Sequence, residues 1–208
     1  MSATAREPDP IPVTLDLYWI PLGAGARVVQ TSGRIYEACA ALAQHRERRS
    51  LYHSALIADL PEGRYCMEMT PIPRRGGSTD RGVVGEGPVG SRLLSRFRLF
   101  RYELRCWLDG TIPDLPYAVD SPVPIATDAV VARRVLALLG EVPRPVWGRD
   151  ELHAGEMWNS NSVISWVLDR AGVLDRAGTP PRGGRAPGWD AGVLVSHRDG
   201  GGDSKAAA

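Results

Sequence analysis

The sequence predicts an α+β fold, in which a small antiparallel sheet packs against helices. Most segments with alternating apolar residues precede residue 110, whereas two of three segments with helical spacing follow residue 127. Strands and helices segregated in this way are typical of the α+β class. The turn signal LPEGR also joins two apolar runs, which indicates an antiparallel hairpin. The 208 residues suffice for one domain with a sizeable core.

The expected organisation is an arm, one domain and a tail. Residues 1–12 hold three prolines and three charged side chains, so we expect a flexible arm. Residues 13–197 contain no Pro/Ser-rich linker long enough to separate two cores, and we expect them to form a single domain. Residues 198–208, RDGGGDSKAAA, are typical of a disordered tail.

The elements expected in the first half are mainly strands. Alternating apolar residues predict a strand at Thr14–Leu22, and a helix is expected to begin near Ser32. The LPEGR turn separates the expected strands Leu51–Asp59 and Arg64–Thr70. The stretch Pro73–Gly90 is rich in Arg and Gly, which predicts a mobile excursion from the fold.

The second half of the sequence predicts one more long strand and two helices. Phe97–Leu108 alternates as a strand does, with an irregularity at Phe100. Asp128–Leu139 is amphipathic at helical spacing, and Gly140 ends it. Ser160–Ala171 has the same spacing, and a short final strand is expected at Gly192–Ser196.

Composition excludes several classes of protein. Twenty-five Lys and Arg against 24 Asp and Glu give a net charge of +1, without the basic field of a dedicated nucleic-acid binder. The apolar runs fall short of the roughly 18 residues of a membrane span. The spacing of Cys39, Cys66 and Cys106 suggests neither a disulfide framework nor a zinc site. We therefore expect a cytoplasmic protein that acts on a small molecule or peptide, with no nucleic acid, membrane, metal or cofactor; its oligomeric state stays open.

The segment MWNSNSVISW holds the most informative residues. Ser160 and Ser162 stand among asparagines where a helix is expected to begin. A helix N-terminus carries unpaired N–H groups and partial positive charge, which stabilise a nucleophile and a developing oxyanion. Ser and Asn are also the preferred capping residues. Two interpretations of Ser160, as a cap and as a nucleophile, therefore stay open.

A nucleophile needs a base, and His53 interrupts the apolar strand LYHSALIAD. Glu68 interrupts the next strand in the same way. Counting back from the turn places His53 opposite about Thr70, one diagonal step from Glu68. The pair is either a catalytic base with the group that orients it, or a structural His–Glu pair on a sheet face.

These three residues resemble the site of the permuted papain-like fold. That fold is the circularly permuted branch of the NlpC-type superfamily, which includes lecithin retinol acyltransferase-like proteins. The resemblance covers roughly residues 14–196 and implies His53 as base, Glu68 as the third polar residue and Ser160 as nucleophile. It departs from the family at Ser160, where a cysteine is normal; an APGW segment at residues 186–189 accompanies the NSNS motif. The implied activity is that of a hydrolase or acyltransferase on an amide, ester or thioester.

Five further residues are expected to contact the substrate. The side chains of Asn159 or Asn161 could join the backbone N–H of Ser160 in an oxyanion hole. Tyr52, Trp158 and Trp189 are the other three. Four tryptophans flank the motif and could either wall an apolar pocket or belong to the core: Trp147, Trp158, Trp166 and Trp189. Two other functions stay open: a non-catalytic binding module of the same fold, and a biosynthetic cyclase that uses the pocket without covalent chemistry.

Three weaker patterns complete the survey. The stretch from Arg74 to Cys106 holds eight arginines and three acidic residues, which predicts a positive rim or a solvated strand face. GEGPVG matches a dinucleotide motif formally but contains Pro88 and does not lead into a helix. His153 and Glu156 have no third partner at a metal-binding spacing, and we interpret them as part of a polar loop.

Overall fold

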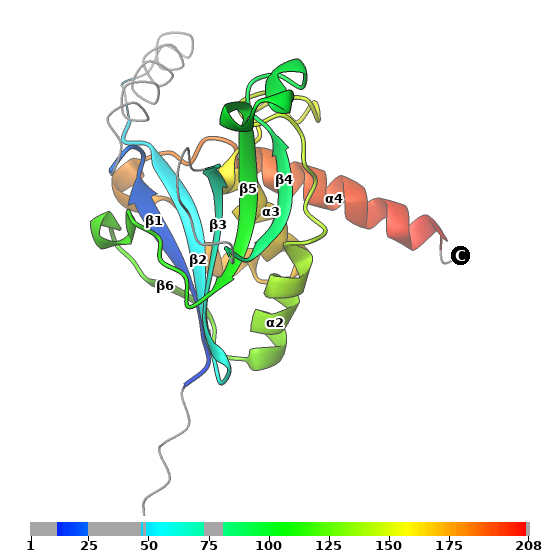
Figure 1. The fold of residues 1–208 in the computed structure, drawn as a ribbon. Coiled ribbons are helices and arrows are strands. Elements are labelled where there is room, and N and C mark those ends of the chain that lie inside the picture. The colour runs from blue at the N-terminus through cyan, green and yellow to red at the C-terminus, as the bar shows by residue number, and fades with distance from the viewer. Residues whose placement is uncertain (1–11, 25–46, 48, 73–80, 207–208) are drawn as a thin grey trace, which may run out of the picture.

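A six-stranded antiparallel sheet with helices on one face forms the body of the computed structural model (Figure 1). The structure describes residues 12–24, 47, 49–72 and 81–206. The strands are β1 (Thr14–Pro21), β2 (Tyr52–Leu60), β3 (Gly63–Pro71), β4 (Val83–Pro88), β5 (Arg101–Leu108) and β6 (Val123–Ala126). They lie in the order β4-β5-β3-β2-β1-β6, and every pairing is antiparallel. The expected α+β class is confirmed.

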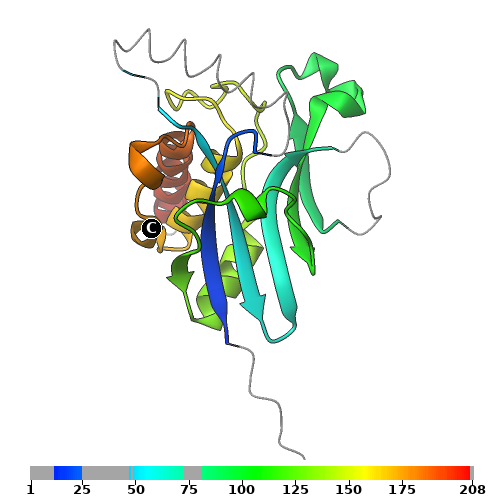
Figure 2. The same ribbon diagram turned by 90° about the vertical axis from the view of Figure 1, so that its left-hand side faces the viewer.

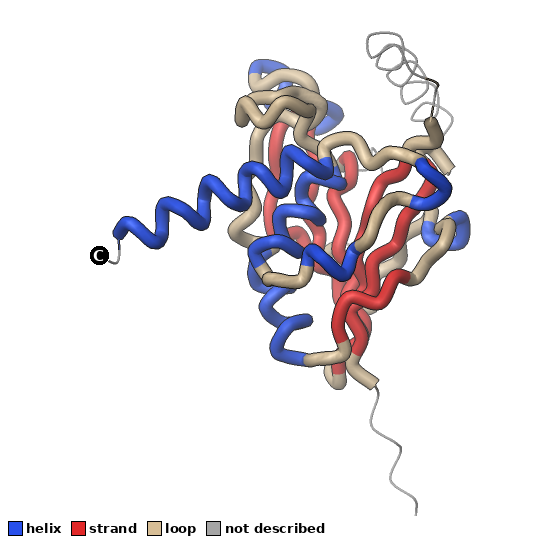
Figure 3. The backbone as a smooth tube through the Cα atoms, turned by 180° about the vertical axis from the view of Figure 1, so that it is seen from behind, coloured by secondary structure: helices blue, strands red, loops and turns tan. Residues whose placement is uncertain are grey.

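In the described ranges, α-helices lie on one side of this sheet (Figure 3). They are α2 (Ala129–Leu138), α3 (Ser160–Arg170) and α4 (Trp189–Ala206). The loop between β5 and β6 crosses the opposite face and contains the 3-10 turn η3 (Leu115–Tyr117), as Figure 2 shows. Helices α2 and α3 agree with the sequence prediction to within a residue or two at each end.

The alternation of β2 explains why its sequence is a nearly unbroken apolar run. Leu56, Ala58 and Leu60 belong to the main core beneath the helices. Ala55 and Ile57 belong to a second, smaller core on the other face, together with Ile112 from the β5–β6 loop. Because successive side chains of a strand point to opposite faces, a strand covered on both sides is apolar at every position.

The expected hairpin of β2 and β3 is confirmed, but its pairing stops half-way. Paired residues run from Leu60↔Gly63 only to Leu56↔Met67. Beyond that point β2 continues its ladder with β1, as far as Pro21↔Tyr52, and β3 continues with β5, as far as Pro71↔Tyr102. The sheet is therefore open between the first residues of β2 and the last residues of β3.

The segment Gly192–Ser196, expected to be a strand, lies inside α4. The prediction was wrong because five residues with alternating apolar side chains fit either element when they are read alone. Residues 198–206, expected in a disordered tail, continue the same helix. Arg198 donates hydrogen bonds to the carbonyls of Leu152 and His153, and Asp199 accepts one from the Trp166 indole. Contacts distant in sequence thus hold a segment of poor helix propensity.

Two further differences concern the edge of the sheet. Part of the expected excursion, Val83–Pro88, is the edge strand β4, which pairs with β5; residues 73–80 lie outside the described residues. The strand expected from Phe97 begins only at Arg101, because Arg98–Phe100 forms a 3-10 turn.

The four-residue strand β6 has too short a pattern to be read from sequence. The helix expected near Ser32 and most of the expected arm also lie outside the described residues.

No helix within the described part of the chain combines the length and the apolar character that crossing a lipid bilayer requires.

We predict that Gly192→Ala destabilises the fold through the α3–α4 contact. A Cβ at Gly192 would lie 2.1 Å from the Ser162 carbonyl oxygen and 2.1 Å from Ser165 Oγ. Overpacking of this kind typically costs about 1–3 kcal/mol. The free energy of unfolding, measured by urea denaturation and circular dichroism, is expected to fall accordingly.

Gly200→Ala in the same helix is the matched control. Its Cβ would meet only Arg170 Nη1, the end of a flexible side chain, at 3.0 Å. Alanine exceeds glycine in helix propensity by up to about 1 kcal/mol, so this variant should be neutral or stabilised. Equal effects of the two substitutions would contradict the described packing of α4 on α3.

Candidate functional site

The NSNS motif begins helix α3, and its N-cap is Asn159. Asn159 Oδ1 accepts hydrogen bonds from the backbone N–H groups of Asn161 (2.8 Å) and Ser162 (3.4 Å). In return Ser162 Oγ accepts from the Asn159 N–H at 3.1 Å, which completes a capping box. Ser160 is thus the first residue of the helix and not its cap.

Asn161 ties the start of α3 to the rest of the fold. Its buried amide group donates to the Tyr52 carbonyl at 3.0 Å and to the Pro187 carbonyl at 2.9 Å. Its Oδ1 accepts from Ser54 Oγ at 2.9 Å. Asn159 Nδ2 donates to the same Pro187 carbonyl at 2.8 Å. The amides of both asparagines are therefore used to hold α3 against β2 and the APGW segment.

Glycine at position 188 lets the APGW segment approach the helix this closely. Gly188 has φ +84°, and a Cβ there would lie 2.6 Å from Ser162 Oγ. Its N–H donates to Glu156 at 2.6 Å, and Arg185 donates to the other oxygen of the same carboxylate. The interpretation of Glu156 as part of a polar loop agrees with these contacts, since both carboxylate oxygens accept hydrogen bonds from the protein.

Ser160 is the one residue of the motif that the capping network does not use. It is only 6% exposed. Within the described chain, neither its hydroxyl nor its backbone N–H has a hydrogen-bonding partner. Both groups are therefore available to a ligand or to water.

Ser160 lines two adjoining cavities. The larger has a volume of about 690 Å³. Its lining residues are Leu22, Leu51, Tyr52, His53, Val89, Gly90, Trp147, Gly148, Arg149, Met157, Asn159, Ser160, Asn161 and Pro187. The smaller, of about 220 Å³, is lined by Leu22, Gly23, His53, Glu68, Met69, Thr70, Pro71, Ile112, Pro113, Asp114, Trp147 and Ser160. His53 and Ser160 thus share both cavities.

His53 and Ser160 reach the smaller cavity from opposite faces of the sheet. On β2 the side chain of His53 follows the alternation of Ala55 and Ile57, away from α3, whereas Ser160 belongs to α3. The cavity is bounded by Met69 of the helix-side core and by Ile112 of the opposite core. It therefore passes through the opening where β2 and β3 no longer pair.

The carboxylate beside His53 belongs to Asp114. His53 Nε2 lies 3.9 Å from Asp114 Oδ2, and both side chains are partly exposed. Burial lowers the pKa of the His53 imidazole below its ordinary value, and the Asp114 carboxylate opposes this shift only in part. His53 is accordingly held in its neutral form, in which it can accept a proton.

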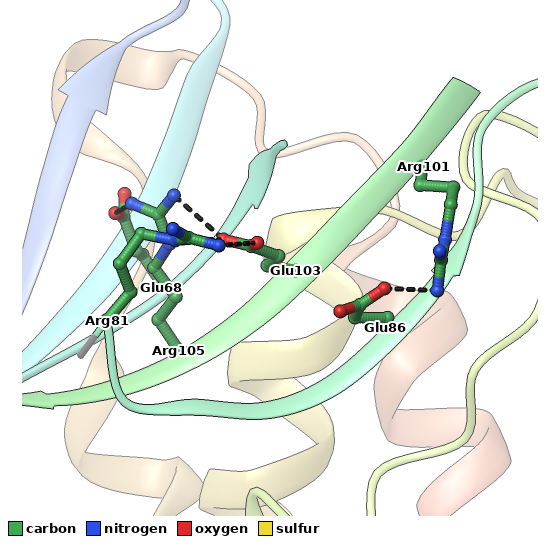
Figure 4. Close-up of polar contacts among 6 residues, drawn as sticks. All are labelled: Glu68, Arg81, Glu86, Arg101, Glu103 and Arg105. Carbon is green, nitrogen blue, oxygen red and sulfur yellow. Dashed lines mark hydrogen bonds and ion pairs between the residues drawn. The ribbon is translucent and has the colours of Figure 1, made fainter. Parts of the chain in front are cut away.

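Glu68 lines the same small cavity but forms an ion pair with Arg105. Its Oε1 lies 3.3 Å from Arg105 Nη1. Burial raises the pKa of the Glu68 carboxyl above its ordinary value, against the opposing effect of Arg105. Figure 4 shows that Arg105 also contacts Glu103, which forms a second ion pair with Arg81 at 2.7 Å. Glu68 is thus one end of a chain of four charged side chains.

The residues expected to contact a substrate divide into two groups. Tyr52, Asn159 and Asn161 line the larger cavity. Trp158 is 2% exposed and lies in the main core, and Trp189 packs on Trp19 with ring centroids 4.9 Å apart. Neither is among the lining residues of these two cavities, and contact of either with a substrate stays a prediction. A tryptophan at helical or loop spacing serves the core as readily as a pocket.

Sequence reasoning missed Asp114 and Arg149, whereas Trp147 was one of the tryptophans left open between a pocket wall and the core. Trp147 walls both cavities, Asp114 approaches His53, and Arg149 lines the larger cavity. Each stands in a loop, where no periodicity fixes the direction of a side chain. The only available signal was the concentration of Trp, Gly and Arg in residues 147–149.

The positive rim expected around residues 74–106 is largely neutralised in its described part. Four of its arginines form ion pairs with carboxylates: Arg81 with Glu103, Arg92 with Glu151, Arg101 with Glu86, and Arg105 with Glu68 and Glu103. Figure 4 shows the pair of Arg101 and Glu86 across β4 and β5. Arg74 and Arg75 lie outside the described residues. Within the described ranges, no cluster of three or more His, Cys, Asp and Glu side chains could hold a metal ion.

Comparison of the chain with protein-family models, with curated proteins and with solved structures finds no match. The resemblance to the permuted papain-like fold stays a prediction from the motifs. What the site can do is inferred from its geometry.

We predict unequal losses of stability for two neighbouring alanine substitutions. Asn159→Ala removes the cap and the bond to Pro187, and should lower the free energy of unfolding by about 1–2 kcal/mol. Ser160→Ala removes a hydroxyl that bonds to no described residue. This variant should change the free energy of unfolding by less than about 0.5 kcal/mol. Urea denaturation of both variants tests this; a larger loss for Ser160→Ala would contradict the assigned cap.

We also predict that His53→Gln makes the free energy of unfolding depend less on pH in mild acid. The pKa of His53 is lower in the folded state, so the unfolded chain binds a proton first as the pH falls. The wild-type free energy of unfolding should therefore decrease as the pH falls below about 6.5, until the pH passes the lower pKa of the folded state.

Urea denaturation between about pH 7.5 and 5 measures this dependence. In His53→Gln the decrease due to the imidazole should be absent. The same slope in both proteins would refute the claim that folding favours the neutral form of His53.

Proposed function

We propose that this chain is a hydrolase or acyltransferase that acts on an amide, ester or thioester, with Ser160 as its nucleophile. The proposal rests on the groups that Ser160 leaves unpaired and on the cavities that it shares with His53. An unpaired hydroxyl and an unpaired N–H stand at the start of an eleven-residue helix, in cavities that His53 also lines. Position 160 is where the papain-like resemblance expects the nucleophile.

His53 is the base in this proposal. Its neutral imidazole takes the proton of Ser160 Oγ as the oxygen attacks the substrate carbonyl and forms the new C–O bond. The imidazolium then returns that proton to the departing amine, alcohol or thiol when the bond to the leaving group breaks. Water, or an acceptor hydroxyl or amine, afterwards displaces the acyl group from Ser160 by the same path in reverse.

Asp114 is favoured over Glu68 as the group that orients the base. Its carboxylate lies 3.9 Å from His53 Nε2 and would stabilise the imidazolium, leaving Nδ1 for the serine. Glu68 is engaged by Arg105. Its role in the proposal is to shape the small cavity, and it takes no part in proton transfer.

The Ser160 N–H is the proposed oxyanion donor. The capping box leaves it as the unpaired N–H of the first helical turn in the described structure, and the positive end of the helix dipole reinforces it. Asn159 and Asn161 already donate to the backbone carbonyls of Tyr52 and Pro187. They are therefore positioning residues for α3.

A non-catalytic binding module is the second candidate. The observation that favours it is that Ser160 Oγ forms no hydrogen bond to His53 in the described structure, while a cavity of about 690 Å³ lies beside both residues. A serine hydroxyl is a weak nucleophile without a base in contact. Covalent labelling separates the two candidates.

We predict that a fluorophosphonate probe modifies the protein once, at Ser160. Intact-mass spectrometry should show one adduct on the wild-type chain and none on Ser160→Ala. Ser95→Ala, which changes a serine outside both cavities, is the control and should be labelled as the wild type is. An unlabelled wild-type protein would favour the binding module, and labelling of Ser160→Ala would exclude Ser160 as the reactive residue.

We further predict that a thiol at position 160 is activated by His53. Burial raises the pKa values of Cys66 and Cys106 to about 11, so both should react slowly. In a Cys39→Ala background, Ser160→Cys should react with iodoacetamide at least about tenfold faster than these two. Adding His53→Ala should abolish the difference, and Asp114→Asn should reduce it.

Peptide mapping after timed labelling measures the rate at each position. A Ser160→Cys thiol that reacts no faster than free cysteine, with or without His53, would mean that the site performs no covalent catalysis. A fast reaction that is independent of His53 would assign the activation to the helix N-terminus alone.

A further inference from the structure

The larger cavity is apolar apart from one end and one charged side chain. Its volume of about 690 Å³ falls within the range of small-molecule sites, roughly 300–1,000 Å³. Its apolar walls include Leu22, Leu51, Val89, Trp147 and Met157. Among its described lining residues there is no carboxylate, and Arg149 is the one that carries a full charge at neutral pH, because His53 is held neutral.

A hydrogen bond to the backbone of Gly90 holds Arg149 at the cavity. Its Nε donates a hydrogen bond to the Gly90 carbonyl, which fixes the plane of the guanidinium. The Nη groups have no hydrogen-bonding partner in the described part of the chain. Glu151 is close in sequence, but its two oxygens are engaged by Arg92, at 2.5 and 2.7 Å, and by the Val146 N–H. A guanidinium with both Nη groups available forms strong paired hydrogen bonds with a carboxylate.

The other polar end of the cavity is at Ser160. There the unpaired N–H and hydroxyl meet the positive end of α3. The cavity thus offers hydrogen-bond donors at two places, with apolar walls around them. An anion without an apolar body would leave those walls solvated. An uncharged apolar molecule would leave the Nη groups of Arg149, an exposed residue, to solvent alone.

We propose that the larger cavity binds an amphipathic anion, namely an apolar acyl compound whose single anionic group, such as a carboxylate, pairs with Arg149. Placement of its acyl carbonyl at Ser160 rests on the proposed function, whereas the pairing with Arg149 does not. The substrate class is therefore an apolar amide, ester or thioester that carries a negative charge away from the reacting carbonyl.

Equilibrium binding tests this inference without any turnover. The full-length Ser160→Ala protein is titrated calorimetrically with octanoate, octan-1-ol and octylamine, which share one apolar chain and differ in charge. Octanoate is expected to bind at least about tenfold more tightly than octan-1-ol, the difference expected for a charge-assisted pair. Octylamine is expected to bind most weakly.

Arg149→Gln should remove the preference of octanoate over octan-1-ol, and Arg149→Lys, which keeps the charge but not the planar fork, should keep part of it. Arg98→Gln alters an arginine outside the cavity lining and should leave the preference unchanged. Equal binding of octanoate and octan-1-ol, no binding of octanoate, or an unchanged preference in Arg149→Gln would each overturn the inference.

These outcomes are distinct from failure of the proposed function. Fluorophosphonate labelling at Ser160 without octanoate binding would support Ser160 as the nucleophile and contradict the proposed substrate class. Octanoate binding that depends on Arg149, without labelling, would confirm the anion site and remove the catalytic role of Ser160.

Discussion

The buried amide of Asn161 is the contact on which the site depends. It donates to carbonyls of β2 and of the APGW segment, and it accepts from the hydroxyl of Ser54 on β2. One side chain thus fixes the first turn of α3 against the sheet and against the segment that leads into α4. Such a buried network is stable only when all its members are satisfied, and this amide is satisfied at both its nitrogen and its oxygen. Ser160, one residue earlier, is placed by this network without taking part in it.

Because β2 and β3 pair only in part, Ser160 and His53 can line the same cavity. Had the hairpin ladder continued past Leu56↔Met67, the sheet would separate His53 on one face from Ser160 on the other. Each strand keeps its ladder with its outer neighbour, β1 or β5, beyond that point, so both stay anchored in the sheet. The opening becomes a cavity that joins the two faces. The ion chain from Glu68 to Arg81 lies along the β3–β5 side of this opening and neutralises the carboxylates buried there (Figure 4).

Local patterns predicted the framework, and long-range contacts decided the rest. The hairpin, α2 and α3 could be read from the LPEGR turn and from helical spacing, because those signals act over a few residues. The Asn–Ser motif was recognised, but Ser160 was left open between a cap and a nucleophile; the structure makes Asn159 the cap. Asp114 could not be predicted as the partner of His53, because a loop distant in sequence brings it across the sheet. Residues 192–206 became a helix because Ser196, Arg198 and Asp199 bond to distant residues, which no short pattern reveals.

The central claim is that Ser160 and His53 act on one proton across the opening between β2 and β3. A crystal structure would measure the distance from Ser160 Oγ to the nearer ring nitrogen of His53. The account predicts about 3–4 Å, or a single water that bonds to both atoms. A separation beyond about 8 Å, too long for one bridging water, would contradict it.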